Sequence, residues 1–509
     1  MPWDELSKIA LLGTDRTVIP TPLKQKLEAL GIDPEMETAE LILKGAAILQ
    51  ARKRAGNILE KWTESIPAID SSVEENHCSP TSTHHLELIL GGAHEPAFNE
   101  FIDLMNSFQK TLSPAFIPII LERALGDADL RKWVLPLAGE RGRWLIQQNP
   151  EWALVFGKVS IDKWVEGNAE VRLNIFEKTR QEDPQVALKL LEASWPGMDI
   201  NVKLAFLQKM QPDLVPSDES FLEDRLYETR KEIRQLAANL LSQIPRSALV
   251  ERMWERVQLF VQFKKDSSGQ QKTVVTLPDN IDETMLRDGI DPRHQWKSGG
   301  LKASRLGQIV AVIPPARWEA ASQESPEALL KIFSKSDWAV LFFQAFSQAA
   351  ILHQNEAWKE VILSMWVKNF ESPKWQDLPT NKLLASLSAA SFDRLCLLAL
   401  KTNSNFSNEH APLLSLIRSS KHLWSATLSK TLIRTFQKWM AQQANSHWGS
   451  WHFRAVLKMA SYRCAISVDA DLRKNWPTDA VVWSAWQRDI EIFLSTLQFR
   501  KEMASALEE

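Results

Sequence analysis

The clearest alternation of apolar and polar positions lies in residues 230–245, RKEIRQLAANLLSQIP. Apolar side chains recur there at intervals of three and four residues, which places them on one face of a helix. These side chains are Ile233, Leu236, Ala237, Leu240, Leu241 and Ile244. The pattern predicts an amphipathic helix that buries one continuous stripe against a core.

The start of this helix recurs upstream, as a β-branched residue followed by a base. The three copies are Val171-Arg172, Val202-Lys203 and Ile233-Arg234, each 31 positions after the last. Other amphipathic stretches lie between the copies. A helix pair repeated at fixed spacing predicts a HEAT-like α-solenoid, in which each unit packs mainly on its neighbours. With only three copies, a chance recurrence stays the alternative.

Several helix starts are marked by a capping side chain directly before a proline. The side-chain oxygen accepts from a free N–H of the first turn, and proline at the first helical position has no N–H to leave unpaired. The five pairs are Thr21-Pro22, Asp33-Pro34, Ser113-Pro114, Asp183-Pro184 and Ser325-Pro326. They predict a fold made of many short helices.

Residues 7–20, SKIALLGTDRTVIP, could begin with a helix or with a strand that leads into a phosphate-binding turn. A phosphate loop needs further glycines, and none follow Gly13 in this stretch. Gly13 instead suits a helix C-cap, where a left-handed residue is favoured. We therefore predict a helix that Asp4 caps and Gly13 ends.

Two segments interrupt the helical pattern. Residues 63–96 are polar, which predicts a loop or linker. Residues 257–313 contain VQLFVQF and KTVVTLP around KKDSSGQQ, which predicts a β-hairpin within an irregular insertion. The apolar stripe from Trp483 to Leu497 predicts a last helix that caps the array.

The predicted fold is an all-α, HEAT-like α-solenoid of helix pairs with a small β-hairpin insertion near the middle. Its parts are N-terminal helices (1–62), the polar loop or linker (63–96), HEAT-like helical repeats (97–256), the hairpin and irregular insertion (257–313), and C-terminal helical repeats (314–509).

Composition narrows the function. The chain has 60 Lys and Arg against 63 Asp and Glu, a net charge of −3, whereas a dedicated nucleic-acid binder usually has a basic excess. Its three cysteines, Cys78, Cys396 and Cys464, are far apart and imply no disulfide framework. No signal-peptide pattern and no apolar run of about 20 residues is found. We expect a cytoplasmic protein with no membrane contact.

No motif assigns a catalytic residue, a cofactor or a metal. The cluster His77, Cys78, His84 and His85 lacks the paired spacing of a zinc finger. The G-x-S-x-G elbow, the P-loop and H-E-x-x-H are absent from the sequence. The sequence favours a protein that is not an enzyme, and an enzyme with scattered catalytic residues is the alternative.

One stretch, GERGRWLIQQNPEWAL (139–154), concentrates arginine and tryptophan. Arginine can clamp carboxylates or phosphates, and tryptophan can stack on a flat partner, which favours a contact surface. The alternative is a corner between two helices, with Asn149 as a cap and Arg141 and Arg143 bound to acids or helix ends.

Five motifs resemble a bacterial family of unknown function, whose members are typically encoded near MoxR-type AAA+ ATPases, von Willebrand factor A proteins and SWIM zinc-finger proteins. The motifs are ALLGTDR (10–16), RGRWLIQQNPEW (141–152), RKEIRQLAANLLSQIPRSALVERM (230–253), TLPDNIDETMLRDGI (276–290) and LGQIVAVIPPARW (306–318). The resemblance supplies no catalytic residues. It makes polar positions inside the motifs candidates for partner binding: Asp15, Arg16, Arg141, Arg143 and Asn149.

We therefore expect a non-enzymatic scaffold or adaptor for protein partners. The resemblance implies that a MoxR-type ATPase or a von Willebrand A protein is such a partner. The alternative is a HEAT-like nucleic-acid-binding or DNA base-repair protein, which would use the local bases Arg225, Arg230, Lys231 and Arg234.

Overall fold

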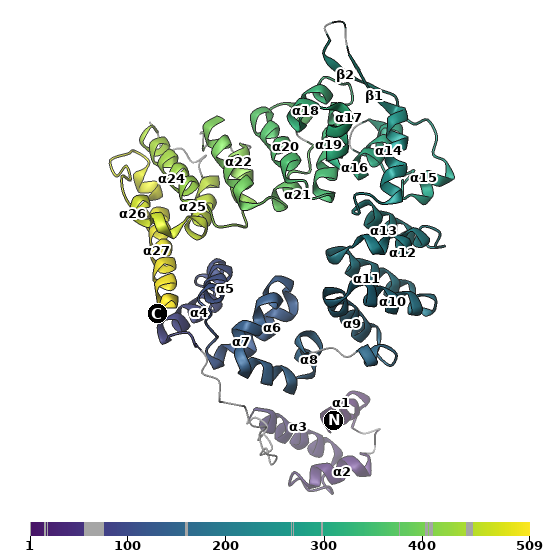
Figure 1. Ribbon diagram of the computed structural model, residues 1–509. Helices are drawn as coiled ribbons and strands as arrows, with labels where there is room; N and C mark the ends of the chain where they lie inside the picture. The colour runs from purple at the N-terminus through teal and green to yellow at the C-terminus, as the bar shows by residue number, and fades with distance from the viewer. Residues whose placement is uncertain are drawn as a thin grey trace. The chain divides into compact units, whose positions relative to one another are not determined.

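The computed structural model describes residues 2–509, except 15–16, 18, 55–75, 158–160, 266, 268, 297–298, 376, 403–405, 407–410 and 444–450. The chain divides into two compact units, Met1–Ile69 and Asp70–Glu509, which are described separately (Figure 1). The division falls within the segment predicted as a linker.

The first unit contains three helices, α1 (Pro2–Leu12), α2 (Thr21–Glu28) and α3 (Thr38–Arg54). Its core includes Leu6, Leu23 and Leu27, all buried. The predicted first helix is confirmed: Gly13 has a φ of 95° and its N–H donates to the Ile9 carbonyl at 3.1 Å. The predicted cap is wrong, because the helix begins at Pro2 and Asp4 lies within its first turn.

The second unit confirms the predicted class, helical with one small hairpin. Its helices are α4 (Pro80–Leu90), α5 (Phe98–Ser107), α6 (Ile117–Gly126), α7 (Ala128–Gln148), α8 (Pro150–Phe156), α9 (Ala169–Glu182), α10 (Pro184–Ser194), α11 (Ile200–Met210), α12 (Glu219–Arg225), α13 (Lys231–Ser242), α14 (Ala248–Phe260), α15 (Glu283–Arg287), α16 (Gly300–Val312), α17 (Pro315–Ser322), α18 (Pro326–Ser334), α19 (Ala339–Leu352), α20 (Glu356–Asn369), α21 (Thr380–Ala385), α22 (Ala389–Thr402), α23 (Pro412–Arg418), α24 (Ala426–Ala441), α25 (Trp451–Arg463), α26 (Asp469–Leu472) and α27 (Trp483–Glu508). The 3-10 helices are Glu95–Ala97, Pro114–Phe116, Ile161–Trp164, Trp195–Gly197, Gln211–Asp213, Pro216–Asp218, Pro373–Trp375 and Ile466–Val468.

The recurring sequence pairs open three equivalent helices, α9, α11 and α13, and α11 packs against both α9 and α13. Each recurring base reaches back to the segment before its own helix. Arg172 donates to the Val165 carbonyl, Arg234 donates to the Glu228 carbonyl, and the Lys203 ammonium lies 5.0 Å from the Trp195 ring centre. The 31-residue recurrence thus has a structural cause, since the base holds the turn that enters the helix.

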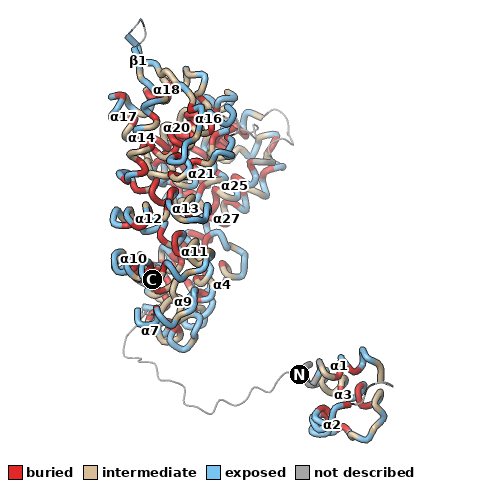
Figure 2. The backbone as a smooth tube through the Cα atoms, turned by 90° about the vertical axis from the view of Figure 1, so that its right-hand side faces the viewer, coloured by how far each residue is buried: buried red, intermediate tan, exposed pale blue. Residues whose placement is uncertain are grey.

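The hairpin is confirmed, with β1 (Val261–Lys265) antiparallel to β2 (Gln271–Val275) and Val261 opposite Val275. The surrounding insertion is not, because helix α16 belongs to the core and packs closely against α14 and α19. Gly307 permits this approach: a Cβ there would lie 2.7 Å from Trp296 and 2.8 Å from Leu341. One apolar core runs from Trp164 to Leu497, so residues 257–313 do not separate two helical halves (Figure 2).

The predicted loop at 63–96 is also wrong in part, because residues 80–90 form helix α4. Ser79 caps the helix by accepting from the Ser82 N–H. The polar face of α4 is buried by a distant segment: the Ser82 hydroxyl donates to the Ala506 carbonyl at 2.6 Å. His85 is buried too, and its Nδ1–H donates to the Thr81 carbonyl.

The last helix, α27, is packed on both sides and is therefore not the predicted cap. It contacts α25 on one side and α4 and α5 on the other, so the series of packed helices returns to its start (Figure 1). At this contact the Arg500 guanidinium, fully buried, donates to both carboxylate oxygens of Glu100 at 2.5 and 2.7 Å. It also donates to the carbonyls of Ser461 and Cys464.

Candidate functional site

The Arg/Trp stretch forms a corner between α7 and α8. Helix α7 kinks at Gly139, whose φ is 60°. Asn149 caps α8, because its side-chain oxygen accepts from the N–H groups of Glu151 and Trp152 at 2.9 and 3.4 Å. Pro150 is the first helical residue. These bonds are those of the predicted corner, and Asn149 has a structural role in it.

The two arginines of this corner are exposed. Arg143 pairs with Glu140 at 2.6 Å, one helical turn away. Trp152 donates its indole N–H to Glu122, whereas the half-buried Trp144 has a buried indole nitrogen with no hydrogen-bond partner among the residues that the structure describes. The corner thus brings Arg141, Arg143 and Asn149 together, and Asp15 and Arg16 lie outside the described residues.

A hollow of about 760 Å³ lies beside this corner, between α7, α8 and α9. Arg143 and Asn174 line it, and Asn174 and Lys178 of α9 donate to carbonyls at the end of α8. Burial lowers the pKa of Lys178, and Glu177 partly opposes this. We assign no site to this cavity.

We expect the Arg141→Ala/Arg143→Ala variant to lose at most about 1 kcal/mol of unfolding free energy, because exposed arginines and surface ion pairs contribute little. Trp144→Ala should cost more, about 2–3 kcal/mol, since part of a large aromatic side chain is buried. Urea unfolding followed by circular dichroism measures both. A larger loss in the arginine variant than in the tryptophan variant would contradict the corner, and partner capture by the arginine variant tests the two arginines as contacts.

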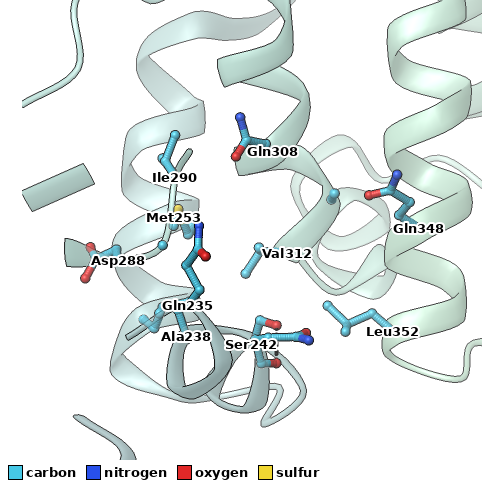
Figure 3. A pocket seen from close by; sticks show the side chains of 14 residues that line it. Gln235, Ala238, Ser242, Met253, Asp288, Ile290, Gln308, Val312, Gln348 and Leu352 are labelled. Atoms are coloured by element: carbon cyan, nitrogen blue, oxygen red, sulfur yellow. Dashed lines mark hydrogen bonds between the residues drawn. The ribbon is translucent and has the colours of Figure 1, made fainter. Parts of the chain in front are cut away.

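A second cavity lies in the middle part of the second unit. It has a volume of about 240 Å³ and lies where α13, α14, α16 and α19 meet the segment 288–290 (Figure 3). Its apolar lining includes Ala238, Met253, Ile290, Val312 and Leu352. We call it the amide pocket, after the three side chains described next.

Gln235, Asn239 and Gln348 line the amide pocket, and their side chains form no hydrogen bond within the described part of the chain. Gln235 and Gln348 come from different helices and lie on either side of Val312 in the view of Figure 3. Each free amide offers two N–H donors and one carbonyl acceptor. Gln308 differs, because it both accepts from the Asp291 N–H and donates to the Asp291 carbonyl, and so anchors that segment.

A third hollow, of about 340 Å³, adjoins the amide pocket and shares Gln235, Gly289 and Ile290 with it. We call it the basic pocket, because its charged lining is Lys231, Arg234 and Arg293 against one acid, Asp291. Lys231 lies 3.5 Å from Asp291. The Arg293 backbone N–H and, more weakly, Lys231 lower the pKa of Asp291, so this acid is charged at neutral pH.

One buried carboxylate holds the wall that both pockets share. Asp288, whose side chain is fully buried, pairs with Arg252 at 2.8 Å, with Arg256 at 2.7 Å and with Arg287 at 3.6 Å. Although burial opposes it, bonding to Asp288 and Glu223 raises the pKa of Arg252. The next residue, Gly289, has a φ of 88°, and a Cβ there would lie 2.6 Å from Ala238. The segment therefore needs glycine to reach α13.

The sequence pointed to Lys231 and Arg234 as local bases, but it did not predict that they line a pocket. The signal that was missed is the pair of amides at Gln235 and Asn239, one helical turn apart on the polar side of the stripe in 230–245. Within the described ranges, no group of three or more His, Cys, Asp or Glu residues could hold a metal ion. The two pockets offer amides and cations, which are groups suited to recognising a polar or acidic ligand.

In the described parts of the chain, none of the helices combines the length and the apolar character that crossing a bilayer requires. No curated protein and no solved structure matches the sequence. The sequence model described as "Family of unknown function (DUF5691)" matches residues 5–507, nearly the whole chain. The chain therefore belongs to the family of unknown function DUF5691.

Proposed function

We propose that this protein is a non-enzymatic, HEAT-like α-solenoid scaffold or adaptor, and that a protein partner places an extended segment in the amide pocket. The observation that supports this is the set of three free amides, Gln235, Asn239 and Gln348, around an apolar floor. An extended peptide backbone exposes N–H and C=O groups that such amides can pair with. Repeat arrays commonly bind partners along extended surfaces.

The partner we propose is a MoxR-type AAA+ ATPase or a von Willebrand A protein. We place the interaction in the cytoplasm. The support for this choice is the resemblance carried by the sequence motifs, whose family is typically encoded near such proteins. The near-neutral composition, 60 bases against 63 acids, is compatible with a protein partner.

The alternative, a nucleic-acid-binding or base-repair protein, would use Arg225, Arg230, Lys231 and Arg234, and among these bases Arg225 and Arg234 make contacts within the fold. The Arg225 guanidinium lies 4.5 Å from the Phe221 ring centre and 5.0 Å from that of Trp195. Arg234 donates to two backbone carbonyls. These contacts favour the protein partner.

We expect the Gln235→Ala/Asn239→Ala/Gln348→Ala variant to capture the partner at least about tenfold less well than the unaltered protein, because each lost amide removes backbone hydrogen bonds. Pull-down from native lysate, with quantification of MoxR-type ATPases and von Willebrand A proteins by mass spectrometry, measures the effect.

The matched control is Gln181→Ala/Gln185→Ala/Gln211→Ala, three exposed glutamines away from the pocket. It should capture the partner as the unaltered protein does. Equal capture by the pocket variant would contradict the proposed site. Recovery of neither kind of partner by the unaltered protein would contradict the partner assignment.

A further inference from the structure

We propose that the basic pocket selects partners whose docking segment is acidic, by binding carboxylate side chains with Lys231, Arg234 and Arg293. This inference rests on the proposed function, because it assumes that the adjoining amide pocket holds the backbone of the same segment. It adds the chemical class of the segment, which neither the amides nor the sequence motifs specify.

The first observation in support is the charge of the side chains that line the basic pocket. Three cationic side chains line it against one carboxylate, that of Asp291. Asp288, on the segment next to the pocket, is occupied by three arginines and does not line it. The lining therefore keeps an excess of positive charge, which an acidic ligand would neutralise.

The second observation in support is that these three cations are still available to a ligand. Arg293 is exposed, and its side chain has no ion pair or hydrogen bond in the described part of the chain. Arg234 uses Nη1 for the carbonyls of Glu228 and Thr229, which fixes the guanidinium while its other N–H groups stay available. Lys231 is half-exposed at 52% and pairs only loosely with Asp291, at 3.5 Å. A held guanidinium beside two accessible cations suits carboxylate recognition.

The third observation in support is that the basic pocket and the amide pocket adjoin each other. Gln235 lines both, with Gly289 and Ile290 on the facing wall. An extended segment advances by about 3.3 Å per residue with side chains on alternate sides. A backbone held at Gln235 can therefore direct a neighbouring side chain towards Lys231 and Arg293.

The lining also favours a peptide over a nucleic acid. Single-stranded nucleic acids are held by cations together with aromatic side chains on which bases stack. The basic pocket has the cations, but its apolar lining is Leu286, Ile290 and Pro292, and none of the described residues that line it is aromatic. We therefore assign an acidic peptide as the occupant.

The test uses the full chain and fluorescein-labelled peptides at low salt. We expect (Glu-Ala)6 to bind and (Gln-Ala)6 to bind at least about tenfold more weakly. Lys231→Glu/Arg293→Glu should weaken (Glu-Ala)6 by at least about tenfold, and Lys231→Gln/Arg293→Gln should weaken it less, because only the second variant avoids adding negative charge. Binding should fall as salt screens the charges.

The matched control is Lys189→Glu/Arg488→Glu, which reverses one exposed lysine and one exposed arginine elsewhere. It changes net charge equally and should leave binding unchanged. Circular dichroism confirms that each variant is folded. Equal binding of both peptides, equal loss in the control, or tighter binding of oligo-dT than of (Glu-Ala)6 would overturn the proposal.

The two proposals fail in different ways. If native partner capture falls with the amide substitutions but is unchanged by the charge reversals, the amide pocket stands and the acidic selectivity is wrong. If (Glu-Ala)6 binding depends on Lys231 and Arg293 but partner capture is unaffected by the amide substitutions, the basic pocket binds acids and the proposed docking function is wrong.

Discussion

Replacing Arg500 by alanine is expected to lower the free energy of unfolding by about 3–5 kcal/mol, the usual cost of leaving one member of a buried ion pair alone. The guanidinium is 0% exposed and its partner Glu100 only 7%. The substitution leaves a buried carboxylate uncompensated and also removes the donor to the carbonyls of Ser461 and Cys464. Urea unfolding followed by circular dichroism measures the loss.

Two variants distinguish this effect from general damage to α27. Arg488→Ala removes an exposed arginine from the same helix and should cost at most about 0.5 kcal/mol. The double variant Glu100→Gln/Arg500→Met should be more stable than Arg500→Ala, because it removes both charges and keeps apolar volume. A loss of less than about 1 kcal/mol in Arg500→Ala would contradict the packing of α27 on α5.

Asp288→Ala is expected to cost a similar amount, about 3–5 kcal/mol, because Arg252, Arg256 and Arg287 all point at this one buried carboxylate. Removing it leaves three cations close together and frees the segment that forms the shared wall of the two pockets. Asp288→Asn, which keeps the shape and an acceptor oxygen, should cost less. Thermal and urea unfolding measure both variants.

The control for Asp288 is an acid nine positions earlier in the chain. Asp279 pairs with Lys302 at the surface, and its side chain is largely exposed. Asp279→Ala should therefore cost at most about 1 kcal/mol. Comparable losses at Asp279 and Asp288 would contradict the view that the buried three-arginine cluster holds the wall.

Local features of the fold could be predicted from the sequence. The stripe in residues 230–245 became α13, with Ile233, Ala237 and Leu241 buried, because helical periodicity is a property of neighbouring residues. The alternation in 261–275 likewise gave the hairpin. Gly13 ended its helix as expected, since a left-handed C-cap is also a local requirement.

Features that depend on distant residues could not be predicted. Glu100 and Arg500 are 400 positions apart, and nothing near either of them shows that they meet. The polar stretch 80–90 looked like a loop because Ser82 and His85 are polar, yet Ala506 and Phe499 from α27 cover them. A local start signal, Ser79 as a cap before Pro80, is present in the sequence, and the contact with α27 accounts for the burial of the polar side chains.

The candidate site was missed for a related reason. The three amide residues, Gln235, Asn239 and Gln348, are ordinary polar residues of helices. Nothing in a sequence shows whether such an amide faces a pocket or open solvent. Gln235 and Gln348 lie on α13 and α19, two helices that are far apart in the chain. The segment that Asp288 holds in place forms a third side of the pocket. Only the packing of these elements shows that the amides share one space.

The contact between α27 and the helices α4 and α5 also sets an order of events during synthesis. The core around Phe101 and Ile120 includes Phe499, Met503 and Leu507, which are synthesised after the other residues of this core. At roughly 5–20 residues per second, the 400 positions between Glu100 and Arg500 take on the order of 20–80 seconds. Throughout that interval the apolar face of α4 and α5 that α27 covers in the finished fold lacks its partner, so the nascent chain exposes apolar surface there until α27 is made.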